Sequence, residues 1–327
     1  MSTLKKILKT LAIPAAVAVV LEGICLANGQ TIISGAKSFD NFVVYTAIVM
    51  ITTMALSINL NSGRFDFSLG AMAGLSSVIG AKITYGFLKG GSGSALFMLI
   101  ITVLAGALLG LISGAVYCAL RLPPIIVSLG VTLVYEGIMY TITGGKYLMS
   151  EVQNRSMSGF VGTWVYAAVI IAAVLIFMII VFERTSFGYD YNALKSGQKV
   201  AVATGINEVK NALICYTICG GLMGLVGMLN AARNTTINGG QLNFGSIAIM
   251  FTTFLPMFIA GYIGRFGNEK VGFLLSALCM SLLNSTFAVF SNQINATTQS
   301  IINAVLLVIF LIYLNNNHLI KRIFAHV

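Results

Sequence analysis

The chain has 327 residues, of which 57% are hydrophobic and only 9% are charged, and its mean hydropathy is +0.93. So few polar residues cannot cover the surface of a soluble globular protein, which excludes soluble enzymes and soluble binding modules. The 19 Lys and Arg residues exceed the 9 Asp and Glu residues. They stand mostly at the ends of apolar stretches, which indicates contact with anionic membrane lipid and not with nucleic acid.

Ten apolar stretches are long enough to cross a bilayer, because a spanning helix needs about 20 residues. We therefore predict an all-α polytopic membrane protein in which residues 1–327 form a single transmembrane domain. Most of the cations fall on the side of the N-terminus, which predicts a short cytoplasmic N-terminus at 1–9, a cytoplasmic loop at about 183–207 and a cytoplasmic tail at about 316–327. The expected spans are about 10–27, 42–60, 67–88, 95–120, 124–143, 164–182, 208–230, 244–262, 271–291 and 298–315.

Two short segments resemble each other, GRFDFSLGA from Gly63 and GQLNFGSIA from Gly240. Each places an acid or an amide, Asp66 or Asn243, before an apolar helix, where its side chain can cap the helix by accepting backbone N–H bonds. Five spans lie between the segments, so they enter the membrane from opposite sides. This arrangement predicts an inverted repeat.

Glycines recur at every fourth residue within several spans, which predicts close helix packing. The pairs and triplet are Gly70 with Gly74, Gly220 with Gly224, and Gly106 with Gly110 and Gly114.

The loop at 183–207 is predicted to hold a short helix that lies across the membrane face, with Asp190 as its N-cap. Thr204 and Gly205 end that helix, and Asn207 caps the next span. A loop of this length that forms regular structure usually contacts a partner. The alternative is an interfacial linker helix without a partner.

Motifs for hydrolysis are missing from the sequence. It has no GxxxxGK[ST] phosphate loop, no GxSxG and no HExxH, so we expect no ATPase site, no catalytic residue and no metal site in this chain. Polar residues within membrane spans are costly in lipid and are therefore candidates for a solute path, although helix capping or interhelical bonding also explains each one alone. These path candidates are Asn59, Asn61, Asp66, Glu136, Asn230, Asn243 and Asn284.

Four segments resemble one known family. GRFDFSLGAMAGL is similar to the GGIDLSVG signature of ribose and xylose type permeases of bacterial ATP-binding cassette (ABC) importers. SGQKVAVATGINEVKN resembles the GGNxxAAxxSGIN loop of that family, and GMLNAARNTTI resembles its GLxxAAR stretch. LPPIIVSLGVTLVYEGIMYTITGG is similar to a segment that opens with proline and closes with a TGG-like turn.

The resemblance implies an ABC importer permease in the bacterial inner membrane, with both termini cytoplasmic, that carries a small polar solute, most specifically a monosaccharide. It implies three partners: a cytoplasmic ATPase that holds ATP and Mg, a periplasmic or lipid-anchored solute-binding protein, and a second permease subunit. This chain itself would hold no cofactor. The segment that couples to the ATPase would be Ser196, Gly197, Gln198, Ala201, Thr204 and Gly205, and candidates for docking the binding protein are Arg233, Asn234 and Asn238.

The chain departs from the family pattern at two positions. Asn243 stands where the second repeat more often has an acid, and Glu136 stands where a basic or neutral residue is expected. The cargo therefore also has alternatives, namely a nucleoside, a furanone signal or a branched-chain amino acid. A rival of another class is a secondary transporter in which Glu22 and Glu136 bind protons.

Overall fold

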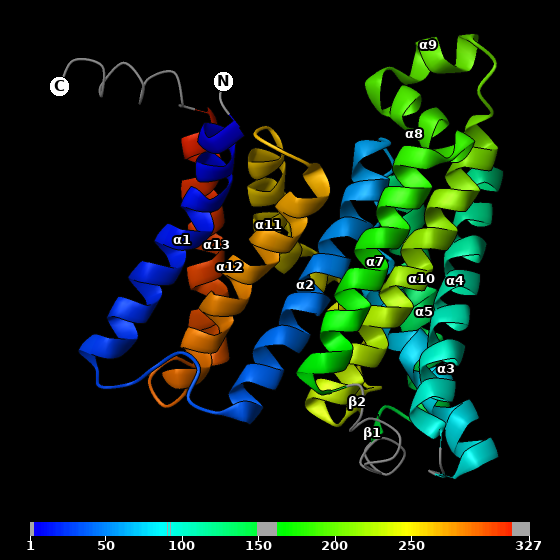
Figure 1. Ribbon diagram of the computed structural model, residues 1–327. Helices are drawn as coiled ribbons and strands as arrows, with labels where there is room; N and C mark the ends of the chain where they lie inside the picture. The colour runs from blue at the N-terminus through cyan, green and yellow to red at the C-terminus, as the bar shows by residue number, and fades with distance from the viewer. Residues whose placement is uncertain (1–2, 90, 92, 149–161, 316–327) are drawn as a thin grey trace.

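In the computed structural model, the described residues are 3–89, 91, 93–148 and 162–315. They form a helical bundle with ten helices that are long and apolar enough to cross a membrane (Figure 1), which confirms the all-α polytopic fold. The predicted cytoplasmic tail at 316–327 lies outside the described residues. The long helices are α1 (Thr3–Ala27), α2 (Ala36–Asn61), α3 (Leu69–Leu88), α4 (Ser94–Leu120), α5 (Pro124–Thr143), α7 (Trp164–Arg184), α10 (Glu208–Asn234), α11 (Ala248–Gly264), α12 (Glu269–Val289) and α13 (Ala296–Asn315).

Five shorter elements complete the described part of the chain. A 3-10 turn, η1 (Gly245–Ile247), leads into α11, and two short helices, α8 (Ser186–Ser196) and α9 (Gln198–Ala203), follow α7. The strands β1 (Tyr147–Leu148) and β2 (Ile237–Asn238) pair in antiparallel register, with Tyr147 opposite Asn238. α8 and α9 stand at one end of the bundle, with the start of α1 and the last turn of α13, and the strands stand at the other end (Figure 1).

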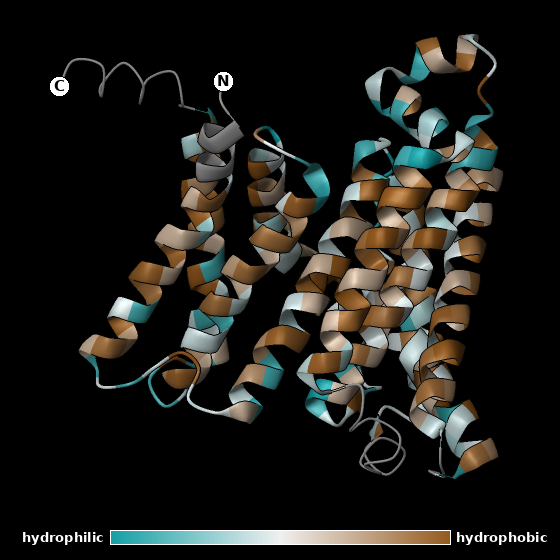
Figure 2. Cartoon of the chain, in the orientation of Figure 1, coloured by the Kyte–Doolittle hydropathy of each residue, from teal (hydrophilic) through white to brown (hydrophobic). Residues whose placement is uncertain are grey.

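The span ends agree with prediction within a few residues, except that α1 and α2 begin six or seven residues earlier than predicted. Within α1 the apolar part is Thr10–Ala27, as expected, and the polar residues before it continue the helix beyond the apolar layer. Brown apolar residues follow the spans, whereas teal residues are found mostly at the helix ends and in the loops, and α8 and α9 mix both (Figure 2).

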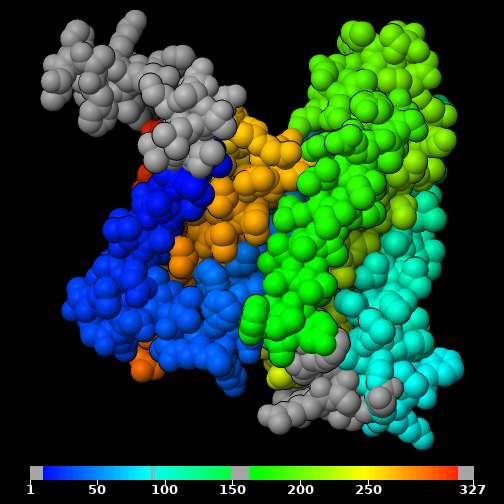
Figure 3. Space-filling view, viewed as in Figure 1, coloured from blue at the N-terminus to red at the C-terminus, as the bar shows by residue number. Residues whose placement is uncertain are grey.

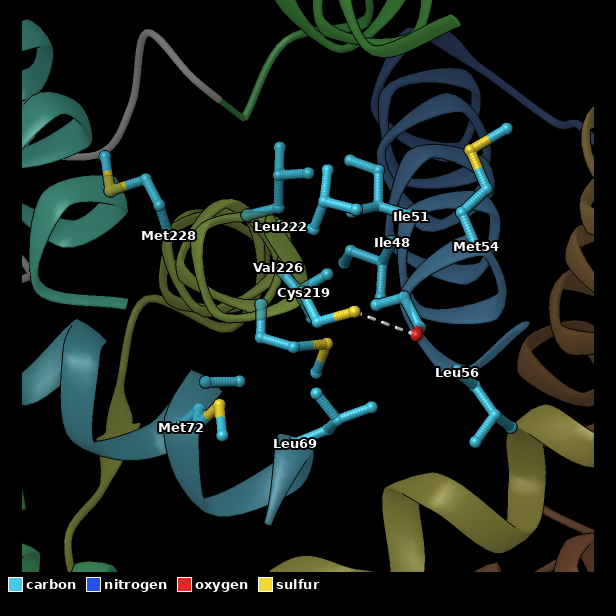
Figure 4. Close-up of a cluster of buried hydrophobic side chains, with 14 of the residues drawn as sticks. Ile48, Ile51, Met54, Leu56, Leu69, Met72, Cys219, Leu222, Val226 and Met228 are labelled. Atoms are coloured by element: carbon cyan, nitrogen blue, oxygen red, sulfur yellow. Dashed lines mark hydrogen bonds between the residues drawn. The ribbon is translucent and has the colours of Figure 1, made fainter. Parts of the chain in front are cut away.

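The centre of the bundle is formed by α2 and α10, which pack against α3, α4, α7, α11 and α12. Their contact is built from methionine, branched aliphatic and thiol side chains, which fill irregular space between helices. Figure 4 shows Cys219 of α10 donating to the carbonyl oxygen of Ala55 in α2, at 3.3 Å. The same cluster includes Leu69 and Met72, so the start of α3 is held against this centre.

The glycine spacing gives close helix packing, as predicted, and the helix that packs on α4 is α10. A Cβ atom on Gly106 would overlap the carbonyl oxygen of Gly220, and one on Gly110 would overlap that of Tyr216. Backbones approach this closely only where side chains are absent.

The two repeat segments meet inside the bundle. Gly70 in α3 packs so tightly against Ser246 in η1 that a Cβ atom on Gly70 would overlap the carbonyl oxygen of Ser246. From this junction α3 runs toward the strand end and α11 runs toward the α8 end (Figure 1). The opposite directions are those expected of an inverted repeat.

Candidate functional site

A cavity of about 230 Å³ opens between α3, α10, the β2 segment and the start of α11. Its wall is mostly amide, hydroxyl and small side chains, and none of the described residues that line it carries a charge. The polar lining residues are Ser77, Asn230, Asn234, Thr236, Asn238, Gln241 and Ser246. Such a wall offers both donors and acceptors to a neutral polar molecule.

Small residues on facing helices create this space. Gly70, Gly74 and Ser77 lie on one face of α3 at helical spacing, and all three line the cavity. Opposite them, Gly227 of α10 sits so close to α3 that a Cβ atom would overlap the carbonyl oxygen of Ala73. The next turn of α10 then presents Asn230 to the space that the missing side chains leave.

The far wall is held by the strand pair. Asn238 stands in β2, and its side-chain oxygen accepts from the backbone N–H of Gly240 at 3.0 Å. Thr143, the last residue of α5, donates to the carbonyl oxygen of Gly239 at 3.1 Å. These bonds fix the loop between α10 and α11 beside the cavity.

Three sequence candidates therefore come together in one cavity: Asn230, predicted for the path, and Asn234 and Asn238, predicted for docking. Gln241, Ser77 and Ser246 were not predicted. A signal for each was present, since Gln241 and Ser246 lie within the second repeat segment and Ser77 extends the Gly70 and Gly74 face by one turn.

The other path candidates lie outside the cavity wall. Asn59 and Asp66 are fully buried, and the amide of Asn59 donates to the Asp66 carboxylate at 3.4 Å. Asn61 donates to the hydroxyl of Ser57 at 2.9 Å, at the α8 end. Asn284 accepts from the Arg233 guanidinium at 3.0 Å.

Arg233 connects three helices. Besides its bond to Asn284 in α12, its guanidinium carbon lies 4.6 Å from the ring centroid of Tyr45 in α2. Its role in docking a binding protein stays a prediction, and so does the role of each path candidate.

The capping predictions for the repeats have different outcomes. Asp66 accepts the backbone N–H of Ser68 at 2.8 Å, so its carboxylate does bond a backbone N–H just before α3, although the N-cap position itself is Ser68. Asn243 as a cap was wrong: its backbone has φ 55°, and the N–H groups of Phe244 and Ser246 instead donate to Glu136 of α5, at 2.9 and 2.8 Å. Glu136 is fully buried and lies behind the cavity wall.

Glu22, the second candidate for proton binding, is far from Glu136. It stands in α1, and its carboxylate accepts the backbone N–H of Ile32 at 3.3 Å in the loop before α2. α1 and α5 lie on different sides of the bundle (Figure 1). The two acids therefore do not form one site.

The loop at 183–207 forms two helices where one was predicted. Thr185 is the N-cap of α8, since its hydroxyl accepts the N–H of Gly188 at 3.2 Å; Asp190 as the N-cap was wrong, because it lies inside α8. α9 ends at Ala203 and Gly205 has φ 94°, as the predicted stop requires. Asn207 caps α10 as predicted, accepting from the N–H of Lys210 at 2.9 Å.

The predicted coupling residues are mostly at the surface. Ser196, Gln198, Thr204 and Gly205 are exposed, and Gly197, between α8 and α9, is partly exposed. Ala201 is buried and anchors α9. Figure 3 shows α8 and α9 (green) protruding beyond the bundle, with a hollow between them and α12 (orange).

Three contacts connect this segment to the spans. Tyr191 of α8 donates to the carbonyl oxygen of Ile58 in α2 at 3.1 Å, and burial raises the pKa of its phenol, so it stays a neutral donor. Lys195 lies 3.4 Å from Glu269 at the start of α12.

The third contact reaches the buried interior. Gln198 of α9 donates to Glu208 at 2.5 Å, and the same carboxylate oxygen lies 3.7 Å from the guanidinium of Arg64. Arg64 is 2% exposed and lies two residues before Asp66 in the first repeat. Through Glu208, α9 is therefore linked to the segment of the first repeat that holds Arg64.

Comparison with known proteins agrees with this architecture. The family model described as branched-chain amino acid transport system / permease component matches residues 38–313. The chain belongs to this permease family. It is a transport permease and not itself an enzyme.

Named relatives of the chain are import permeases. The Galactose/methyl galactoside import permease protein MglC of Haemophilus influenzae is 27% identical over 237 residues, which is 66% of this chain and 69% of that protein. The Ribose import permease protein RbsC of Escherichia coli K12 is 24% identical over 285 residues, 82% of this chain and 83% of that protein. The Autoinducer 2 import system permease protein LsrC of Photorhabdus laumondii is 25% identical over 251 residues, which is 73% of this chain and 70% of that protein. No solved structure matches the chain.

Proposed function

We propose that this chain forms the solute path of an ATP-driven ABC importer and that its cargo is a neutral polyhydroxylated molecule, most specifically a monosaccharide. The observation that carries the proposal is the cavity whose described lining holds amides and hydroxyls and no charge. Hydroxyl groups both donate and accept, and amide side chains do the same without the desolvation cost of an ion. The relatives named for galactose and ribose import support the same solute class.

One of the alternative cargoes fits this wall less well. A branched-chain amino acid is zwitterionic, and it would bring two charges to a wall that offers no opposite charge among the described lining residues. A nucleoside or an autoinducer is neutral and stays an alternative cargo. A competition assay separates them: uptake of a labelled neutral sugar by the assembled transporter is measured against excess unlabelled sugars, nucleosides and branched-chain amino acids. Sugars alone should compete, and competition by leucine would overturn the solute class.

We assign one partner to each end of the bundle. The ATPase, which binds ATP and Mg, docks on α8 and α9, and the solute-binding protein docks at the strand end, beside the cavity. A second permease subunit completes the transporter. The α8 end then faces the cytoplasm and the strand end faces the periplasm.

The orientation is testable by cysteine labelling. Lys199 in α9 and Lys37 at the start of α2 are both exposed and lie at opposite ends of the bundle. In a cysteine-free background, an impermeant thiol reagent added to intact spheroplasts should label Lys37→Cys, and Lys199→Cys should react only in inverted vesicles. Reversed labelling would contradict the orientation.

Asn230 is expected to bind the solute directly. Asn230→Leu keeps the side-chain size and removes a donor and an acceptor from the cavity wall, at a cost of about 0.5–1.5 kcal/mol for each hydrogen bond lost. The concentration of solute needed for half-maximal uptake by the assembled transporter should rise about two- to tenfold. Asn303→Leu, in α13 and absent from the cavity lining, serves as the control. Equal effects of the two substitutions would remove Asn230 from the path.

A further inference from the structure

The starts of the two repeat helices carry the same set of hydrogen bonds. In the first repeat, one carboxylate oxygen of Asp66 accepts both the backbone N–H of Ser68, at 2.8 Å, and its hydroxyl, at 2.6 Å. In the second repeat, one carboxylate oxygen of Glu136 accepts the backbone N–H of Ser246, at 2.8 Å, and its hydroxyl, at 2.6 Å. The second oxygen of Glu136 accepts the N–H of Phe244 at 2.9 Å.

The acid comes from a different place in each repeat. Asp66 is two residues before its serine, whereas the second repeat has Asn243 at that position of the segment and an additional residue, Gly245, between Phe244 and Ser246. Asn243 is exposed and has a left-handed backbone, so its side chain does not serve the helix start. The two departures from the family pattern are therefore complementary: the acid that the segment lacks is present on α5.

We propose that Glu136 is a positioning residue that supplies, from α5, the missing carboxylate of the second repeat and thereby fixes Ser246 in the wall of the cavity. A fully buried carboxylate is stable only when its oxygens are bonded, and here two backbone N–H groups and one hydroxyl do so at the positive end of a helix. Ser246 in turn contacts Gly70 of the first repeat, so Glu136 holds the junction of both repeats.

The test measures the cavity wall directly. In a background without the five native cysteines, Ala248→Cys reports on the α11 wall and Asn234→Cys on the α10 wall; both residues are exposed and line the cavity. Glu136→Gln keeps the volume but replaces one accepting oxygen by an N–H donor, so the N–H group of either Phe244 or Ser246 loses its acceptor. Labelling by a small thiol reagent should then change about tenfold or more at Ala248→Cys and stay the same at Asn234→Cys, as expected for losing a charge-assisted hydrogen bond.

A matched variant distinguishes a local change in the cavity wall from a general loss of structure. Ser246→Ala removes one of the three donors and should change labelling at Ala248→Cys in the same direction but by less, with the melting temperature nearly unchanged. Equal changes at both reporters, or no change at either, would overturn the proposal. That this wall serves transport rests on the proposed function. The labelling needs neither cargo nor ATPase, so it tests the positioning role of Glu136 separately from the proposed transport function.

Discussion

Gly197→Trp is expected to separate the permease from its ATPase while the helix bundle stays folded. Among the described residues, no heavy atom outside its chain neighbours lies within 4 Å of a Cβ atom placed on Gly197, and its φ of 178° suits any residue. The indole would therefore project outward into the groove of the motor. Overpacking of a close contact costs about 1–3 kcal/mol, which weakens docking about five- to a hundredfold.

Co-purification of the ATPase with the tagged permease measures this effect, and ATP-dependent uptake in vesicles should fall with it. Lys195→Gln is the control, because the Lys195–Glu269 pair is exposed and contributes about 0–1 kcal/mol. Full retention of the motor and of transport by Gly197→Trp would show that α8 and α9 are an interfacial linker.

Ala248→Trp is expected to block the cavity and to leave motor docking intact. Ala248 is exposed at the start of α11 and lines the cavity, so a large side chain there fills the space of the solute without displacing the helix core. Uptake should fall by about tenfold or more, as for overpacking of a close contact. The ATPase should still co-purify.

The control at this position is Ala248→Ser, which keeps the residue small and should transport normally. Together, Gly197→Trp and Ala248→Trp separate two functions of one chain, motor docking at one end and solute passage at the other. Normal uptake by Ala248→Trp would mean that the solute crosses elsewhere.

The positions of the spans were predictable from the sequence. So were the helix caps whose bonding partner lies only a few residues away. Apolar length alone located ten spans, because the bilayer sets a fixed minimum. Asn207 was recognised as a cap because its partner, the N–H of Lys210, is three residues away. Asp190 was wrong as the N-cap of α8, because the start of this helix is set by the end of α7 at Arg184, which places Thr185 at the cap position.

The site depended on tertiary contacts that a single sequence does not contain. Asn230 and Gln241 are separated by the strand-forming loop, and they share a cavity only because β2 pairs with β1. The bonds of Glu136 to Phe244 and Ser246 span more than a hundred residues. The departures at Glu136 and Asn243 were visible in the sequence, but their mutual compensation was visible only in the packed bundle.

The central claim is that solute moves through this chain only when an ATPase drives it. The direct measurement is solute uptake into proteoliposomes that contain the purified permease alone, or the permease with its ATPase and binding protein, each under ATP and under an imposed proton gradient. The account predicts uptake only in the complete assembly with ATP, and none with the isolated chain under either condition. Proton-driven uptake by the isolated chain that is lost in Glu136→Gln would contradict it and identify a secondary transporter.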